Sequence, residues 1–95
     1  MQVRKFAVAV YARSLIFLLG GHEKSVASVL VFVYDTYADE WAEFPSLNFA
    51  RHSHSAIALS DNLFAFGGRD DEFNLLGSIE CLKVGSDSKW NLIVN

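Results

Sequence analysis

The chain repeats itself, and this repeat constrains its fold more than any other feature of the sequence. Residues 4–21 read RKFAVAVYARSLIFLLGG and residues 51–68 read RHSHSAIALSDNLFAFGG, so the two segments align without a gap at a spacing of 47 residues. Trp41 and Trp90 follow at a spacing of 49, which places two extra loop residues in the second copy. Repeats of this length are stacked modules that bury their apolar faces against one another. The chain therefore holds about two such modules.

The composition favours a folded protein that does not bind nucleic acid. The sequence is 52% apolar and 14% aromatic, which is too hydrophobic for a disordered chain. The net charge is −3 and no basic stripe follows any element, so we expect no nucleic-acid partner. Cys81 is the only cysteine, and the chain contains no Asn-x-Ser/Thr site. An internal disulfide is therefore impossible, and we expect a cytoplasmic protein.

The apolar segment near the N-terminus has three possible interpretations: a signal peptide, a membrane helix, or a pair of strands. Arg13-Ser14 divides the apolar residues Phe6–Leu19, and neither half approaches the roughly 20 residues that a membrane span requires. The second copy has the same layout, with Ser60-Asp61-Asn62 at the break. A signal peptide would not recur inside the domain. We therefore expect two strands joined by a turn, and no membrane partner.

Turn signals divide each copy into four short strands. A four-stranded sheet of this kind forms one blade of a β-propeller, so we expect one blade in residues 1–47 and a second in residues 48–95. A double glycine ends the second strand of each copy, where glycine tolerates positive φ and lets another backbone approach closely. The expected strands are Lys5–Ala12, Leu15–Leu19, Val29–Tyr34 and Trp41–Phe44 in the first copy, and Ser55–Leu59, Leu63–Phe66, Ser78–Val84 and Trp90–Val94 in the second.

Several of these strands are apolar on both faces. Val29–Tyr34 reads VLVFVY and Leu15–Leu19 reads LIFLL, whereas a strand with one solvated face alternates apolar and polar residues. An antiparallel sheet built from such strands must be covered on both sides. Blades stacked around a propeller axis meet this need, whereas a two-sheet sandwich covers only one face of each sheet.

The order of these features resembles the kelch repeat. In the first copy the matching residues are Gly20-Gly21, Tyr34-Asp35 and Trp41, and in the second they are Arg51, His54-Ser55, Gly67-Gly68 and Trp90. The resemblance covers nearly the whole chain and implies an all-β fold, with two four-stranded antiparallel blades of a kelch-type β-propeller. The second copy departs from the pattern because Lys83 stands seven residues before Trp90, where the first copy has Tyr34.

Two blades are too few for a closed propeller, which has roughly 4–8 blades. A bare blade face reaches the upper range of the apolar patch that a monomer tolerates, about 300–600 Å². We therefore expect further kelch blades in the same protein or self-association, for example a head-to-tail ring of three chains.

The sequence singles out no catalytic, cofactor-binding or metal-ligating residue. His52 and His54 lie on one side of an extended segment, but no third ligand is near, and His22 lacks an equivalent spacing. The acidic run Asp70-Asp71-Glu72 is not followed by EF-hand spacing, so we interpret it as a solvated loop. Cys81 in mid-strand is interpreted as an inert thiol. The chain has neither a phosphate-loop motif nor a G-x-S-x-G nucleophile motif.

The resemblance also suggests where a partner would bind. In kelch propellers, the segment entering the first strand and the loop after the double glycine lie toward one rim or face, and such loops commonly bind proteins. In members that capture acidic peptides, arginines and serines there make the contacts. The candidates by position are Arg51, Ser53, Arg69 and Ser78. Arg51 has an alternative role as a structural tie between neighbouring blades.

The function that the resemblance implies is a protein-interaction module that binds a peptide or protein through its loops. Many kelch proteins are substrate adaptors for ubiquitin ligases with a BTB or F-box domain, and others bind actin. Two alternatives stay open: a segment of a copper oxidoreductase-like kelch enzyme, or a partial gene product without an independent function. The enzyme class typically holds copper through tyrosine and histidine and bears disulfides, and this sequence offers no matching ligand set.

Overall fold

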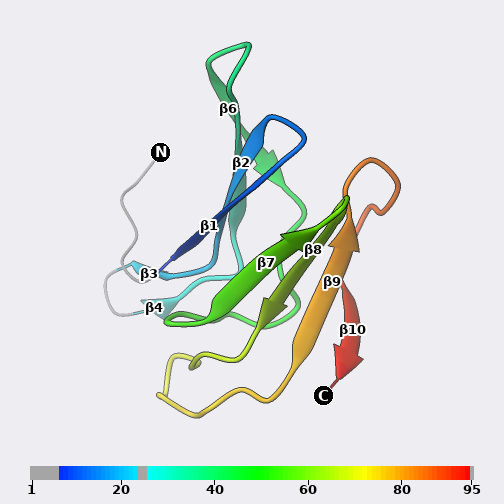
Figure 1. The fold of residues 1–95 in the computed structure, drawn as a ribbon. Coiled ribbons are helices and arrows are strands. Elements are labelled where there is room, and N and C mark those ends of the chain that lie inside the picture. Colours follow the sequence, from blue (N-terminus) through cyan, green and yellow to red (C-terminus); the bar gives the residue numbers. More distant parts are fainter. Residues whose placement is uncertain (1–6, 24–25, 95) are drawn as a thin grey trace.

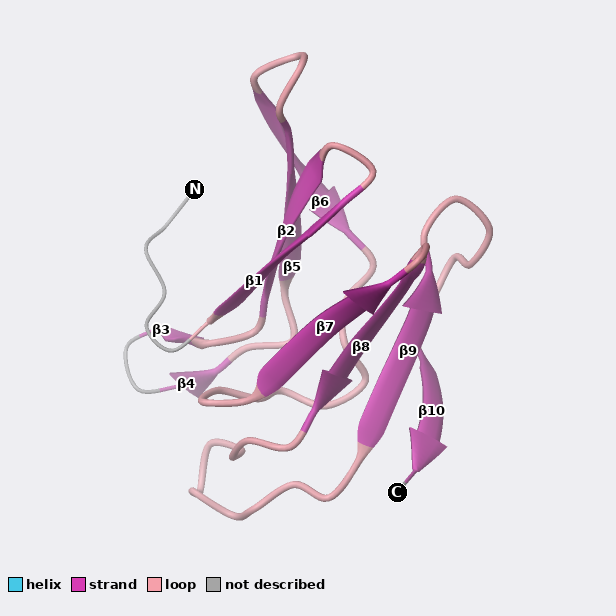
Figure 2. Ribbon diagram, in the orientation of Figure 1, coloured by secondary structure: helices cyan, strands magenta, loops and turns pink. Residues whose placement is uncertain are grey.

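The computed structural model describes residues 7–23 and 26–94, and all the elements in this part of the chain are strands (Figure 2). Two four-stranded antiparallel sheets lie face to face without closing into a ring (Figure 1). In spatial order, the first sheet contains β1 (Val8–Ala12), β2 (Leu15–Leu19), β5 (Val31–Asp35) and β6 (Glu40–Phe44). The second contains β7 (Ser55–Leu59), β8 (Asn62–Phe66), β9 (Ile79–Lys83) and β10 (Asn91–Val94).

The all-β prediction with two four-stranded antiparallel blades is confirmed, and the eight expected strands all occur. The expected start of the first strand, at Lys5 and Phe6, lies outside the described residues. Between the expected strands Leu15–Leu19 and Val29–Tyr34, where we expected no strand, the structure has a further hairpin of β3 (His22–Glu23) and β4 (Val26–Ala27). Strands of two residues are too short to produce a periodic signal. The boundary placed between residues 47 and 48 stays a prediction.

The core lies between the two sheets, and the second sheet contributes both large side chains, Leu63 and Leu82, and alanines to it. Phe17 and Leu19 of β2 are fully buried, and so is Ala65 of β8. Ala56 and Ala58 of β7 pack against the same cluster. Because close-packed interiors leave few voids, the alanines of β7 and β8 let the two sheets approach closely at these positions.

The double glycines lie at the junction of the blades, where backbones approach one another. Gly20 has a φ of +60°, and a Cβ added there would lie 2.5 Å from the carbonyl oxygen of Arg51. Gly68 has a φ of +85°, and its added Cβ would lie 2.6 Å from the His52 carbonyl oxygen and 2.6 Å from the His54 Cβ. Glycine is therefore required at both positions by conformation and by space.

We expect alanine at Gly68 to destabilise the protein more than alanine at Gly67. Both glycines have positive φ, so each change costs about 1–2 kcal/mol from the left-handed backbone. The Cβ of Gly67→Ala meets nothing within 4 Å, whereas that of Gly68→Ala meets His52 and His54. Overpacking there adds about 1–3 kcal/mol. Urea unfolding of the two variants measures the difference, and equal losses would contradict the close approach at Gly68.

Candidate functional site

Arg51 lies beneath the loops that follow the double glycines, and its side chain is fully buried. Its Nη1 donates to the carbonyl oxygens of Gly67 (3.0 Å) and Ser78 (3.2 Å). Its Nη2 donates to the Ser78 hydroxyl and to the Glu80 carboxylate, each at 2.8 Å. The backbone of Arg51 joins the other blade, because its carbonyl oxygen accepts the Gly21 N–H at 2.8 Å. The residue thus ties both blades together.

Glu80 of β9 completes this buried network, and its side chain is also fully buried. Its carboxylate accepts one N–H from Arg51 and the backbone N–H groups of Asn48 and Phe49. Two charges removed from water are stable together only when hydrogen bonds satisfy them, and Glu80 accepts three N–H groups here, one from Arg51 and two from the linker. The sequence reasoning missed Glu80. The available signal was a lone carboxylate among apolar residues of a strand.

The structure separates the four predicted partner residues into two pairs. Arg51 and Ser78 are buried and bonded to one another inside the second blade. Ser53 and Arg69 are exposed and lie near each other, because the backbones of His52 and Arg69 exchange hydrogen bonds at 3.0 Å and 2.9 Å. The Arg69 Nη1 donates to the carbonyl oxygen of Phe73 at 2.8 Å. Only the second pair therefore offers side chains to a partner in this two-blade structure.

The histidines form a packed cluster at the junction. His54 is 6% exposed between Gly20 and Gly68, and burial lowers its pKa to about 4, with smaller contributions from the charges of Arg51 and His52. His54 is therefore neutral at pH 7. The ring of His52 contacts those of His22 and Phe73 edge to face, with centroids 5.0 Å and 5.4 Å apart.

The described residues contain no group of three or more histidine, cysteine, aspartate or glutamate side chains placed to hold a metal ion. Two carboxylates of the acidic run, those of Asp70 and Asp71, accept hydrogen bonds from the loops. Asp70 accepts the backbone N–H groups of Glu72 (2.9 Å) and Asn74 (3.0 Å), and the bond from Asn74 is the main cause of its lowered pKa. Asp71 accepts the N–H of Ala27 from the other blade. These contacts make the run a structural part of its loop.

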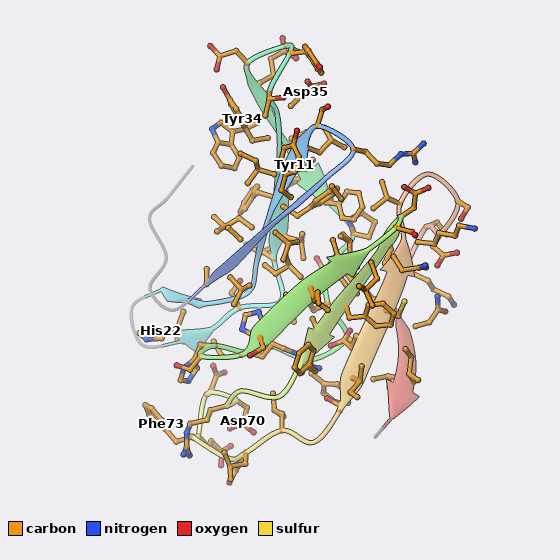
Figure 3. All side chains as sticks on the ribbon, in the orientation of Figure 1. Tyr11, His22, Tyr34, Asp35, Asp70 and Phe73 are labelled. Atoms are coloured by element: carbon orange, nitrogen blue, oxygen red, sulfur yellow. The ribbon has the colours of Figure 1, made fainter. Side chains whose placement is uncertain are left out.

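The loop after β8 (residues 67–78) and the β3–β4 hairpin form one surface, which we call the loop face. It is joined across the blades by the contact between Asp71 and Ala27 and by the ring contact between His22 and His52. Figure 3 shows His22, Asp70 and Phe73 at this end of the molecule, with Tyr34 and Asp35 at the opposite end. Among its described residues, the exposed apolar side chains are Val26 (57%), Phe73 (65%) and Leu75 (75%).

The two repeat tryptophans occupy different environments. Trp90 is buried, and its Nε1 donates to the carbonyl oxygen of Pro45 at 2.8 Å, which fixes the linker between the blades. Trp41 is 48% exposed and packs on Tyr34 with ring centroids 5.1 Å apart. Cys81 is partly buried, and burial raises the pKa of its thiol, which therefore stays protonated and unreactive at neutral pH.

Among the described residues, no helix has the length and apolar character needed to cross a bilayer.

No family model matches the chain. Alpha-scruin of Limulus polyphemus is 35% identical over 98 residues, which cover 96% of this chain. The Kelch repeat protein M-T9 of Myxoma virus is 27% identical over 94% of the chain. The Kelch repeat and BTB domain-containing protein 1 of Cowpox virus is 32% identical over 79% of it. The chain spans only 11% to 18% of the length of these relatives.

We expect Arg51→Met to destabilise the protein by about 3–5 kcal/mol, because it leaves the Glu80 charge buried without its partner. Arg69→Met is the matched control. Arg69 is exposed, and its side chain donates one bond to Phe73, so its loss costs about 1 kcal/mol or less. Chemical unfolding of both variants measures the two losses. Similar small losses would contradict the structural role of the buried pair.

Proposed function

We propose, on the premise that this chain belongs to the kelch-repeat family, that it is a protein-interaction module whose loop face binds a peptide or protein segment. The family membership and the two blades supply the rigid scaffold. The observation that carries the proposal is the exposure of Phe73, Leu75 and Val26 together on loops held by that scaffold. Binding residues are commonly found on loops that a rigid framework positions.

Hydrogen bonds within the chain hold the loop face in place without a partner. The Gly68 carbonyl oxygen accepts the Leu76 N–H at 2.9 Å, and Asp70 bonds to the backbone of the same loop. The hydrogen bond between Asp71 and Ala27 connects this loop to the first blade. A preformed surface loses less entropy on binding than a mobile one, which supports a docking role.

We assign different roles to the four candidate residues. Ser53 and Arg69 contact the partner, since both are exposed near Phe73: Arg69 bonds to the Phe73 carbonyl oxygen, and Ser53 follows His52, whose ring contacts that of Phe73. Arg51 and Ser78 act indirectly, because they hold the backbone from which the loop departs at Gly67. The partner then meets an apolar centre with a polar rim, which is the usual composition of a protein–protein interface.

A substrate-adaptor role in the cytoplasm is the narrower form of this proposal. The name of the cowpox relative places a BTB domain beside kelch repeats, and this is the combination that the resemblance associates with substrate adaptors. A single cysteine and the lack of glycosylation sites support a reducing compartment for this chain.

The loop face is tested by affinity capture from an extract of the source cells with three versions of the chain. We expect Phe73→Ser/Leu75→Ser to reduce capture of the partner about tenfold or more, because central apolar anchors dominate binding energy. Tyr37→Ser is the matched control: it removes an exposed aromatic side chain (88%) from the turn between β5 and β6, outside the loop face. Loss of capture with Tyr37→Ser, and retention with the loop variant, would contradict the proposal.

A further inference from the structure

His54 lies where the two blades meet, and its side chain fills the space that two glycines leave open. A Cβ added to Gly20 of the first blade would lie 2.9 Å from the ring atom Cε1. One added to Gly68 of the second blade would lie 2.6 Å from the His54 Cβ. The side chain is 6% exposed between these two backbones, so water reaches the ring freely only when the blades separate there.

The polar atoms of this ring are buried without compensation. Neither ring nitrogen of His54 has a hydrogen-bond partner among the residues that the structure describes. The Nε of Arg51 is likewise buried without a partner in that part of the chain. A neutral imidazole tolerates such a site, whereas a buried charge without a partner is far more costly.

The charged groups around His54 oppose its protonation. Arg51 carries a charge of the same sign, and its partner Glu80 is already bonded to Arg51 and to two backbone N–H groups of the linker. His52 also disfavours a proton on His54, and the carbonyl group of Leu19 favours one only weakly. The closed junction therefore offers an imidazolium no strong acceptor.

The closed junction consequently binds this proton more weakly than an open one does. Burial is the main cause, and with the charges of Arg51 and His52 it lowers the pKa of His54 from its ordinary 6.5 to about 4. An open junction returns the ring to water and to its ordinary pKa. Opening is therefore favoured progressively as the pH falls from about 6.5 to about 4, and the effect saturates below that range.

The glycines that enclose His54 are also the points from which the loop face departs. The β3–β4 hairpin follows Gly20-Gly21, and the loop of residues 67–78 begins at the second glycine pair. The Gly21 N–H donates to the carbonyl oxygen of Arg51 across the junction at 2.8 Å. A separation at the glycines breaks this bond and displaces the two halves of the loop face relative to one another.

We propose that His54 is an acid-sensitive latch between the blades: uptake of a proton by its ring opens the junction at Gly20 and Gly68 and loosens the loop face that starts there. The imidazolium then takes water as its hydrogen-bond partner, which the closed junction does not provide. The latch is a property of the junction itself and operates whether or not the loop face binds a partner.

Hydrogen exchange of the Gly21 amide at pH 7 and pH 5 tests the latch, with protection factors that remove the pH dependence of the chemical exchange step. We expect the opening constant to rise about twentyfold, because the ring titrates near 6.5 when open and near 4 when closed. His54→Gln replaces the ring with a planar polar group that does not titrate, and it removes most of this rise. His22→Gln is the matched control and keeps the rise, since the His22 ring contacts His52 outside the enclosed site.

Two results would overturn the proposal. One is a folded His54→Gln variant whose opening constant rises as much as that of the wild-type chain. The other is an NMR titration of the folded wild-type chain in which the His54 imidazole gains its proton near pH 6.5, since the closed junction would then accept the charge. The latch requires a neutral His54 ring in the closed form down to about pH 5. If His54→Gln loses its β-sheet circular dichroism, this titration decides the question without a variant.

Discussion

The buried pair of Arg51 and Glu80 is the interaction on which the rest of this structure depends. Both side chains are fully removed from solvent, so every charge must find a partner within the protein. Arg51 reaches β9 and the end of β8, while Glu80 holds the backbone of Asn48 and Phe49 in the linker. The pair thereby fixes the linker, the second sheet and the origin of the 67–78 loop with respect to one another.

The close approach of the blades follows from this junction. Gly20 and Gly68 enclose His54, which stays neutral because burial lowers its pKa to about 4. A neutral histidine fits between glycines where a charged one would need a compensating group. The loop face lies next to this layer. The positions of Phe73 and Arg69 are therefore set by their contacts with His52 within the chain, before any partner binds.

The fold was predictable from the sequence, whereas the candidate site was predictable only in part. The repeat, the double glycines and the two-sided apolar strands determine blade type and strand order, because these are local patterns at fixed spacing. Arg51 and Ser78 are buried, whereas Ser53 and Arg69 are exposed. Local patterns could not predict this difference, because the charge of Arg51 is paired with Glu80, which lies 29 residues further along the chain. The β3–β4 hairpin was missed because its pairing of His22 with Ala27 leaves no periodic trace.

Native-state hydrogen exchange tests the central claim, that the buried pair makes the two blades one cooperative unit, most directly. The amides to follow are those of Phe17 in β2 and Phe64 in β8, which are interior strands of the two sheets. The account predicts the same opening free energy for both amides, since neither blade keeps its covered face without the other. Clearly different opening free energies, with one blade opening while the other stays closed, would contradict it.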